Sequence, residues 1–140
     1  MDDPYNLRRF VEAQDPVYEA IFDELKSGLK TSHWMWFVFP QIKGLGFSSM
    51  ARQFAIASVE EAEAYLGHPI LGARLRDCTQ LVNDVEGRTA RQIFGHPDDL
   101  KFRSSMTLFA KVAQDDHVFE AALAKYSEGK HDPLTLRVLG

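Results

Sequence analysis

Residues 69–85 read PILGARLRDCTQLVNDV and carry the clearest periodic pattern of the chain. Apolar side chains recur there at intervals of three and four residues, at Leu71, Leu75, Cys78, Val82 and Val85. This spacing places them along one face of an α-helix. Pro69 suits the first turn, because its missing N–H would have no partner there. The stretch predicts a helix with one buried face, in which Cys78 is a small buried side chain.

Similar boundaries divide the rest of the 140 residues. Proline follows Asp or His at five places: Pro4, Pro16, Pro69, Pro97 and Pro133. Glycine follows helical apolar patterns at five more: Gly28, Gly67, Gly87, Gly95 and Gly129. The first arrangement is typical of helix starts and the second of helix ends. Ser58–Glu61 and Thr89–Gln92 fit the capping-box pattern. We therefore expect an all-α fold, a compact bundle of about eight short helices that forms a single domain over residues 1–140.

The segment from Ser32 to Ser49 does not follow this pattern. Residues 33–39, HWMWFVF, are apolar on all sides, so a buried strand and a buried helix both fit. Pro40 ends the run, and Gly44-Leu45-Gly46 follows as a flexible turn. We favour a short buried helix that is capped by Ser32.

Composition limits the classes of function. The chain is 45% hydrophobic and 26% charged, which is ordinary for a globular protein. Its net charge of −4 and pI of about 5.7 argue against a general nucleic-acid-binding protein. The acidic start lacks the basic and apolar regions of a signal peptide, and the run Trp34–Phe39 is too short to cross a bilayer. We expect a cytoplasmic protein without a membrane partner.

Metal binding and disulfide formation find little support. The five histidines never fall four residues from a second ligand, and a single Cys cannot build a thiolate site. His68 and His96 precede prolines, where a role in a turn is the simpler interpretation. We therefore predict no metal and no cofactor.

One long window of the chain carries no acidic residue. Between Leu25 and Val59 there is no Asp or Glu, although 20 acids in 140 residues would place about five there. The window holds both tryptophans and four cations: Lys26, Lys30, Lys43 and Arg52. A site for an anionic ligand would have this character, because a nearby carboxylate would repel the ligand. Burial is the alternative explanation, since carboxylates are rare in a core.

Two features of this window could contact such a ligand. The turn Gly44–Gly46 leads to Ser48 and Ser49, which could cap a helix or donate to an anion. No Gly-Lys-Ser/Thr ending is present, so this is not a P-loop. His33 stands beside Trp34 and could act as an acid or base, or be a hydrogen-bonded structural residue. Trp34 or Trp36 could stack a planar ligand, and Gln41 and Lys43 could line the same opening.

A second concentration of polar residues lies at 98–106, DDLKFRSSM. On a helix Asp99 and Arg103 are four residues apart and can pair, while Asp98 and Lys101 share another face. Ser104 and Ser105 are poor helix formers, so close helix packing or another need for a small polar side chain is indicated. Neither serine has an identifiable neighbouring base, so the segment lacks a group that a nucleophilic serine would need.

The chain resembles a bacterial domain family of unknown function. The similarity rests on several motifs: Asn6-Leu7 with Phe10-Val11, the segment Ser32–Gln41, Gly44–Gly46, His68-Pro69 with Leu71-Gly72, and Phe94-Gly95 with Arg103–Met106. The resemblance implies a small all-helical fold and no established activity. Members of that family often carry the label "calpastatin", which this chain does not fit, because such an inhibitor is a repetitive, disordered chain of low hydrophobicity.

Our leading hypothesis is a pocket for a small anionic, partly planar, nucleotide-like ligand, which the protein binds or processes. It would form where the Trp/His segment meets the helix of the two serines, with His33 as the proton-transfer group. The other expected ligand-binding residues are Trp34, Trp36, Gln41, Lys43, Ser48, Ser49, Arg52, Lys101, Arg103, Ser104 and Ser105. The alternative is a protein-interaction or self-association module without catalysis, in which exposed aromatic residues dock a partner or a second copy.

Overall fold

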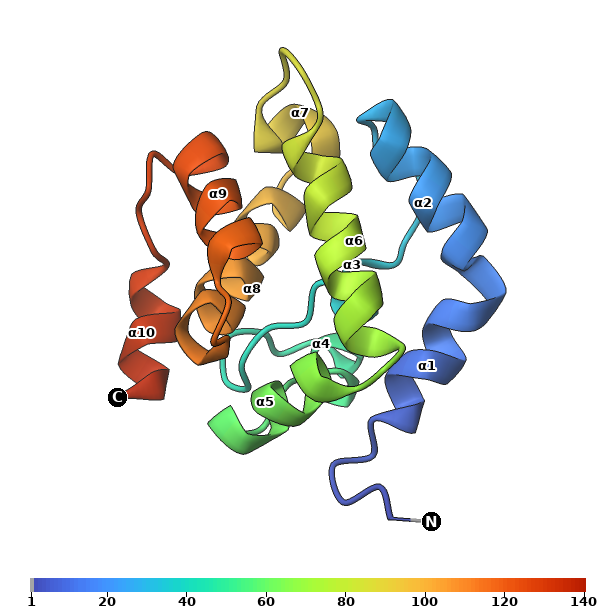
Figure 1. Cartoon of the computed structure of the whole chain (residues 1–140), viewed down its shortest axis with the longest axis vertical. Coiled ribbons are helices and arrows are strands. Elements are labelled where there is room, and N and C mark those ends of the chain that lie inside the picture. The colour runs from blue at the N-terminus through green and yellow to red at the C-terminus, as the bar shows by residue number, and fades with distance from the viewer. Residues whose placement is uncertain (1) are drawn as a thin grey trace.

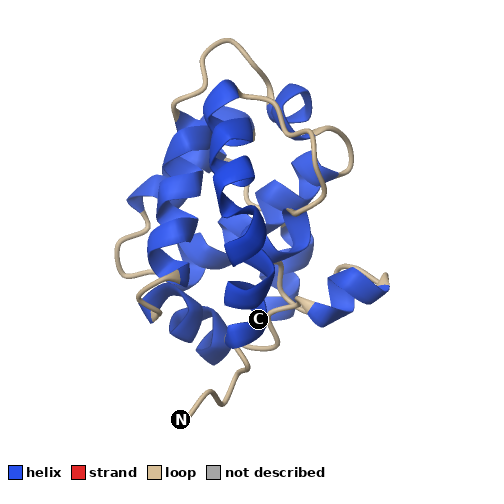
Figure 2. Cartoon of the chain, turned by 90° about the vertical axis from the view of Figure 1, so that its right-hand side faces the viewer, coloured by secondary structure: helices blue, strands red, loops and turns tan. Residues whose placement is uncertain are grey.

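The fold was analysed in a computed structural model that describes residues 2–140. Ten α-helices and one 3-10 helix follow one another in these residues: α1 (Arg8–Gln14), η1 (Asp15–Val17), α2 (Tyr18–Ser27), α3 (Met35–Val38), α4 (Ser49–Gln53), α5 (Val59–Gly67), α6 (Leu71–Asn83), α7 (Ala90–Phe94), α8 (Asp98–Val112), α9 (His117–Tyr126) and α10 (Pro133–Leu139). Helices joined by loops make up the described chain (Figure 2), and the all-α prediction is confirmed. The extra helices beyond the expected eight are short ones.

Two helices form the middle of the arrangement. α8 packs against α5, α7, α9 and α10, and α6 packs against α2, α5 and α9. In Figure 1 the N-terminal helices α1 and α2 lie at one side of α6, while α9 and α10 lie at the other. Eight of the fifteen residues of α8 are buried, because it is contacted from several directions. Any site along its remaining exposed face is therefore held by a well-packed helix.

Several predicted helix boundaries agree with the structure, but Pro4 precedes the start of α1 by four residues and Pro69 precedes that of α6 by two. The predicted helix over 69–85 is α6, and Cys78 is fully buried, which raises the pKa of its thiol to about 11. Thr89 and Gln92 form the complete capping box. Ser58 accepts from the Glu61 amide, but the Glu61 carboxylate reaches the amide of Ala57 instead of closing the box.

The apolar segment before Pro40 forms the short buried helix α3, as predicted. Its proposed cap is wrong, because Ser32 donates its hydroxyl to the Glu24 carboxylate and α3 has no side-chain cap. Gln14 of α1 fixes α3 from the other side, since its Nε2 donates to the Phe37 carbonyl over 2.7 Å. Buried backbone groups of a short helix need such partners.

Aromatic side chains connect α3 to the rest of the core. The rings of Phe39 and Phe102 meet edge to face with centroids 5.0 Å apart, and Phe94 stacks on Phe102 at 4.7 Å. Trp34 packs on Phe39 at 6.2 Å. These distances are typical of favourable aromatic pairs. The core thereby fixes the Trp/His segment against the first turns of α8.

The segment after Pro40 returns to the same layer. Ile42 and Ile56 form an isolated parallel bridge, in which the Lys43 amide donates to the Ile56 carbonyl over 2.8 Å and the Ile56 amide donates to the Gln41 carbonyl over 2.9 Å. Residues 43–55, which include α4, therefore form a closed loop that stands over α8. No helix in residues 2–140 is both long enough and apolar enough to span a membrane.

Candidate functional site

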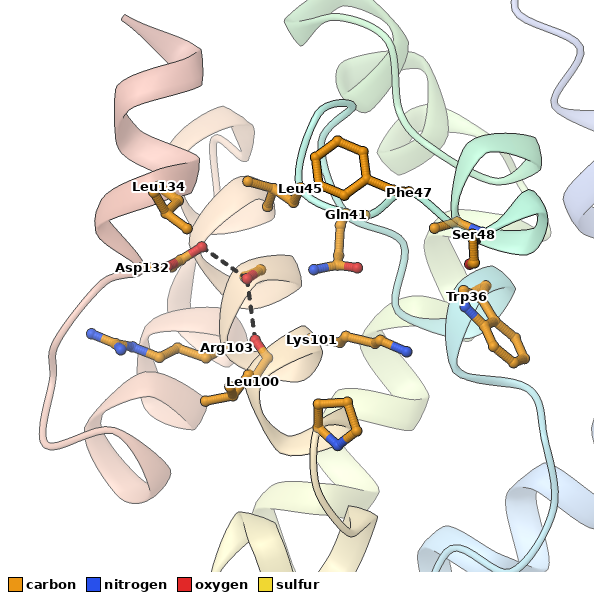
Figure 3. A pocket seen from close by; sticks show the side chains of 14 residues that line it. Trp36, Gln41, Leu45, Phe47, Ser48, Leu100, Lys101, Arg103, Asp132 and Leu134 are labelled. Atoms are coloured by element: carbon orange, nitrogen blue, oxygen red, sulfur yellow. Dashed lines mark hydrogen bonds between the residues drawn. The ribbon is translucent and has the colours of Figure 1, made fainter.

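A hollow of about 530 Å³ lies between the loop that carries α4 and the first half of α8 (Figure 3). We call it the α8 hollow. Its lining residues come from four stretches of the chain: Trp36, Gln41, Leu45, Gly46, Phe47, Ser48, Ala51, Pro97, Leu100, Lys101, Arg103, Ser104, Asp132 and Leu134. The volume is within the range of small-molecule sites, and apolar walls with a few polar groups are typical of them.

The two sequence-distant segments that were predicted to meet do lie together here. Six of the predicted ligand-binding residues line the α8 hollow: Trp36, Gln41, Ser48, Lys101, Arg103 and Ser104. The aromatic contact between Phe39 and Phe102 explains the meeting, because it joins the segment that carries Trp36 to α8. Whether these residues bind a ligand stays a prediction.

Other predicted residues lie elsewhere. Trp34 is 1% exposed and donates its indole N–H to Glu24, so its ring belongs to the core and cannot stack a ligand. His33 is exposed and does not line the α8 hollow, so the structure offers no support for proton transfer there. Ser105 is fully buried, which agrees with close helix packing. Its hydroxyl has no hydrogen-bond partner in the described chain.

Three of the four cations of the acid-free window lie away from the hollow. Lys26, Lys43 and Arg52 are exposed and lie outside its lining, and Ser49 is exposed outside it as well. Ser48 lines the hollow, but its hydroxyl caps α4 by accepting from the Ala51 amide over 3.1 Å. Lys43, Ser48, Ser49 and Arg52 lie on the loop that carries α4, which turns most of their side chains to solvent, whereas Lys26 lies on α2.

Two lysines share one carboxylate beside the α8 hollow, and of these three residues only Lys101 lines it. Lys30 Nζ lies 2.9 Å from Asp98 Oδ2, and Lys101 Nζ lies 3.3 Å from Asp98 Oδ1. Each ammonium also stands over an indole ring, Lys30 at 5.2 Å from Trp34 and Lys101 at 5.1 Å from Trp36. Because one carboxylate cannot neutralise two ammonium groups, one positive charge remains at this edge.

Arg103 has a different role from the expected one. It does not pair with Asp99, which hydrogen-bonds His96 Nδ1 over 3.0 Å. Instead Arg103 donates to the carbonyls of Lys130 and His131 over 3.0 and 2.8 Å. Its guanidinium therefore points away from Lys101 in Figure 3 and holds the loop before α10.

Asp132, which no sequence pattern singled out as a site residue, faces the α8 hollow from that loop. Asp132 Oδ2 accepts from the hydroxyls of Ser104 and Thr135 over 2.8 and 2.6 Å, and the Asp132 amide donates to the Thr107 hydroxyl. Burial alone would raise the pKa of Asp132, but the hydrogen bonds from Thr135 and Ser104 outweigh it and lower the pKa below its ordinary value. The carboxylate is charged at neutral pH. The bond from Ser104 also explains why a small polar side chain occurs inside α8.

Gln41 provides the remaining polar group. Its side chain extends into the α8 hollow between Asp132 on one side and Lys101 with Trp36 on the other, in the view of Figure 3. Its backbone carbonyl is used in the bridge to Ile56, and its side-chain amide forms no hydrogen bond within residues 2–140. An unpaired amide in an open hollow offers a donor and an acceptor to a ligand.

One known family matches almost the whole chain. The family described as "Protein of unknown function (DUF1810)" matches residues 4–139. The chain belongs to this family.

A solved structure supports the same assignment. The crystal structure of the conserved hypothetical protein Rv1873 from Mycobacterium tuberculosis has a TM-score of 0.97 to this chain. The two sequences are 55% identical, and the similarity covers 98% of each chain. No curated protein matches the chain. These comparisons establish the family and the fold, and they name no ligand and no reaction.

Two further observations bear on other sites. Within the part of the chain that the structure describes, no three His, Cys, Asp or Glu side chains lie in a group that could hold a metal ion. A second hollow of about 560 Å³ lies between α5, α8 and α10, lined by Val59, Val112, Leu136 and Leu139 together with the charged side chains of Glu63 and Lys111. The α8 hollow differs in combining an aromatic wall, an uncompensated charge and an unpaired amide.

Proposed function

We propose that the α8 hollow binds a small, partly planar ligand that carries an anionic group, of the size and character of a nucleotide. The observation that carries the proposal is the sharing of Asp98 by Lys30 and Lys101, which leaves positive charge beside Trp36. An anion beside Lys101 would compensate this charge, and a planar group would find an aromatic surface next to it.

The proposal is for binding, without an assigned reaction. His33 is not among the lining residues, and Ser104 donates to Asp132, an arrangement that secures a loop. A nucleophile needs an adjacent base to remove its proton. Asp132 has a lowered pKa and accepts from two hydroxyl groups, so it is a weak base.

Lys101→Ala should weaken binding of an anionic probe without unfolding the protein. Lys30 stays paired with Asp98 in this variant, so the ion pair nearest the core is retained. We expect the Kd of adenosine monophosphate, measured by isothermal titration calorimetry, to rise about tenfold, the effect of losing one charge-assisted contact. Raising the ionic strength should shrink the difference between the two proteins.

Lys43→Ala is the matched control. Lys43 has the same charge and lies on the neighbouring loop, but it is exposed and does not line the α8 hollow. We expect its Kd to equal that of the unmodified protein. Equal losses in both variants would mean that only overall charge matters, and the α8 hollow would be rejected as the anion site.

Self-association is the second candidate function. Large apolar side chains are exposed at Phe47 (76%), Leu100 (51%) and Leu134 (54%), and all three line the same hollow. Exposed apolar groups gathered in one place mark interaction surfaces. If a second copy covers them, sedimentation velocity should reveal a dimer that Phe47→Ser dissociates. A monomer at all concentrations would remove this candidate and leave the apolar rim to contact the ligand.

A further inference from the structure

The α8 hollow has charges of opposite sign on its walls. This restricts the chemistry of the ligand more than the need for an anionic group alone. Lys101 is at the edge of the hollow beside Trp36, while Asp132 faces it from the loop before α10 (Figure 3). A ligand with negative charge throughout would meet Asp132 as well as Lys101. Like charges in one site disfavour binding, so the group that approaches Asp132 must be a donor or a cation.

The free hydrogen-bonding capacity of Asp132 indicates what that group is. Oδ2 accepts from the hydroxyls of Ser104 and Thr135 and from the Thr135 amide, and the Leu134 amide also approaches the carboxylate, whereas no side chain of the described residues donates to Oδ1. An ionised carboxylate only accepts hydrogen bonds, and each oxygen has more than one acceptor position. Oδ1 is thus left to accept from a bound molecule.

In the view of Figure 3 the Gln41 amide lies between Asp132 and Lys101. It can form hydrogen bonds with two adjacent atoms of a ligand. A carboxamide donates and accepts at once, so it pairs with a planar ring edge on which a donor stands next to an acceptor. Heteroaromatic rings with an exocyclic amino group beside a ring nitrogen have such an edge. In the view of Figure 3 Asp132 lies on one side of Gln41, so an amino group placed between the two side chains would contact both.

We infer that the α8 hollow selects ligands in which an amino-substituted heteroaromatic ring is joined to an anionic group. The amino group contacts Asp132 and Gln41, and the anionic group lies beside Lys101. This inference rests on the proposed function. It adds the chemical character of the end of the ligand that lies opposite the anionic group. It distinguishes amino-bearing bases from bases with an oxo group at the same position.

Two matched pairs of probes test the selection on the full chain by calorimetry. Adenosine and inosine monophosphates differ in one exocyclic group, amino against oxo, and in the ring nitrogen beside it, which is an acceptor in the first and carries a hydrogen in the second. Cytidine and uridine monophosphates differ in the same way. We expect the amino member of each pair to bind about tenfold more tightly, because an oxo group would face the Asp132 carboxylate as a second acceptor.

Variants identify the residue that discriminates. Asp132→Asn should bring the two members of a pair within about twofold of each other, since an asparagine amide can rotate to donate to the oxo group. Asp116→Asn is the control: it makes the same carboxylate-to-amide change at an exposed residue outside the α8 hollow, so selection should persist. Thermal denaturation of each variant verifies that it is folded before titration.

The outcomes separate this inference from the proposed function. If both members of each pair bind equally to the unmodified protein, and Lys101→Ala weakens both, the anion site stands and the selection by Asp132 is overturned. Selection that survives Asp132→Asn also overturns it. If none of the four nucleotides binds, the proposed function fails and this inference fails with it.

Discussion

Replacing Gly72 with alanine should lower the free energy of unfolding by about 2 kcal/mol or more. A Cβ atom built at Gly72 would lie 2.1 Å from the Leu66 carbonyl oxygen and 2.9 Å from its carbon. Both are backbone atoms of α5, so no side chain can rotate away to make room. The α5–α6 connection would have to open, although alanine is otherwise the better helix former.

Gly67→Ala is the matched control for this prediction. Gly67 ends α5, only five residues before Gly72, and a Cβ atom there would meet nothing within 4 Å. Chemical denaturation should leave the Gly67 variant within about 0.5 kcal/mol of the unmodified protein. Equal stability of the two variants would show that α5 and α6 do not approach each other as closely as the structure places them.

The sequence predicts the helices well because their signals are local. The spacing of Leu71, Leu75 and Cys78 alone determines which face of α6 is buried, and the Thr89–Gln92 box marks the start of α7. The close approach at Gly72 has no such signal. A glycine in a helical pattern is ambiguous until the partner, here the Leu66 carbonyl, is known.

The candidate site could be predicted only in part, for a similar reason. Composition identified the segment of Trp36 and the helix of Lys101 but not Asp132, which appears in the sequence as a helix cap before Pro133. It does cap α10, and the same carboxylate also faces the α8 hollow. One side chain with two roles cannot be recognised from spacing, because the second role depends on where α10 packs against α8.

The acid-free window after Glu24 fits either an anion site or a buried segment, and one carboxylate just outside it serves several of its donors. Glu24 itself reaches into the window from α2. Its Oε1 accepts from the amides of Thr31 and Ser32 and from Trp34 Nε1, and its Oε2 accepts from the Ser32 hydroxyl. A second carboxylate is not needed for these donors.

Replacing Glu24 with alanine should therefore destabilise the protein by about 2–4 kcal/mol. The variant leaves the indole N–H of Trp34, a side chain that is 1% exposed, without a partner inside the protein. The turn at Thr31 and Ser32 loses its acceptors as well. Urea denaturation measures the loss. Asp23→Ala is the control, because Asp23 is an exposed carboxylate on the same helix and forms no hydrogen bond in the described chain.

The contribution of Glu24 should also depend on pH in a defined direction. Burial would raise the pKa of Glu24, but hydrogen bonds from Ser32, Thr31 and Trp34 outweigh it and lower the pKa from 4.5 to about 2. A carboxylate whose pKa is lower in the folded state stabilises that state fully above the unfolded value and loses the effect as the pH falls toward the folded value. The stability difference between the unmodified protein and Glu24→Gln should be largest above about pH 5 and shrink steadily between pH 4.5 and 2.

Glutamine keeps one acceptor oxygen, so this variant isolates the charge from the hydrogen bonds. A difference that stays constant from pH 7 to pH 3 would mean that the charge on Glu24 does not hold the segment of Trp34 and Trp36 in place, and that neutral hydrogen bonds and core packing are sufficient to do so.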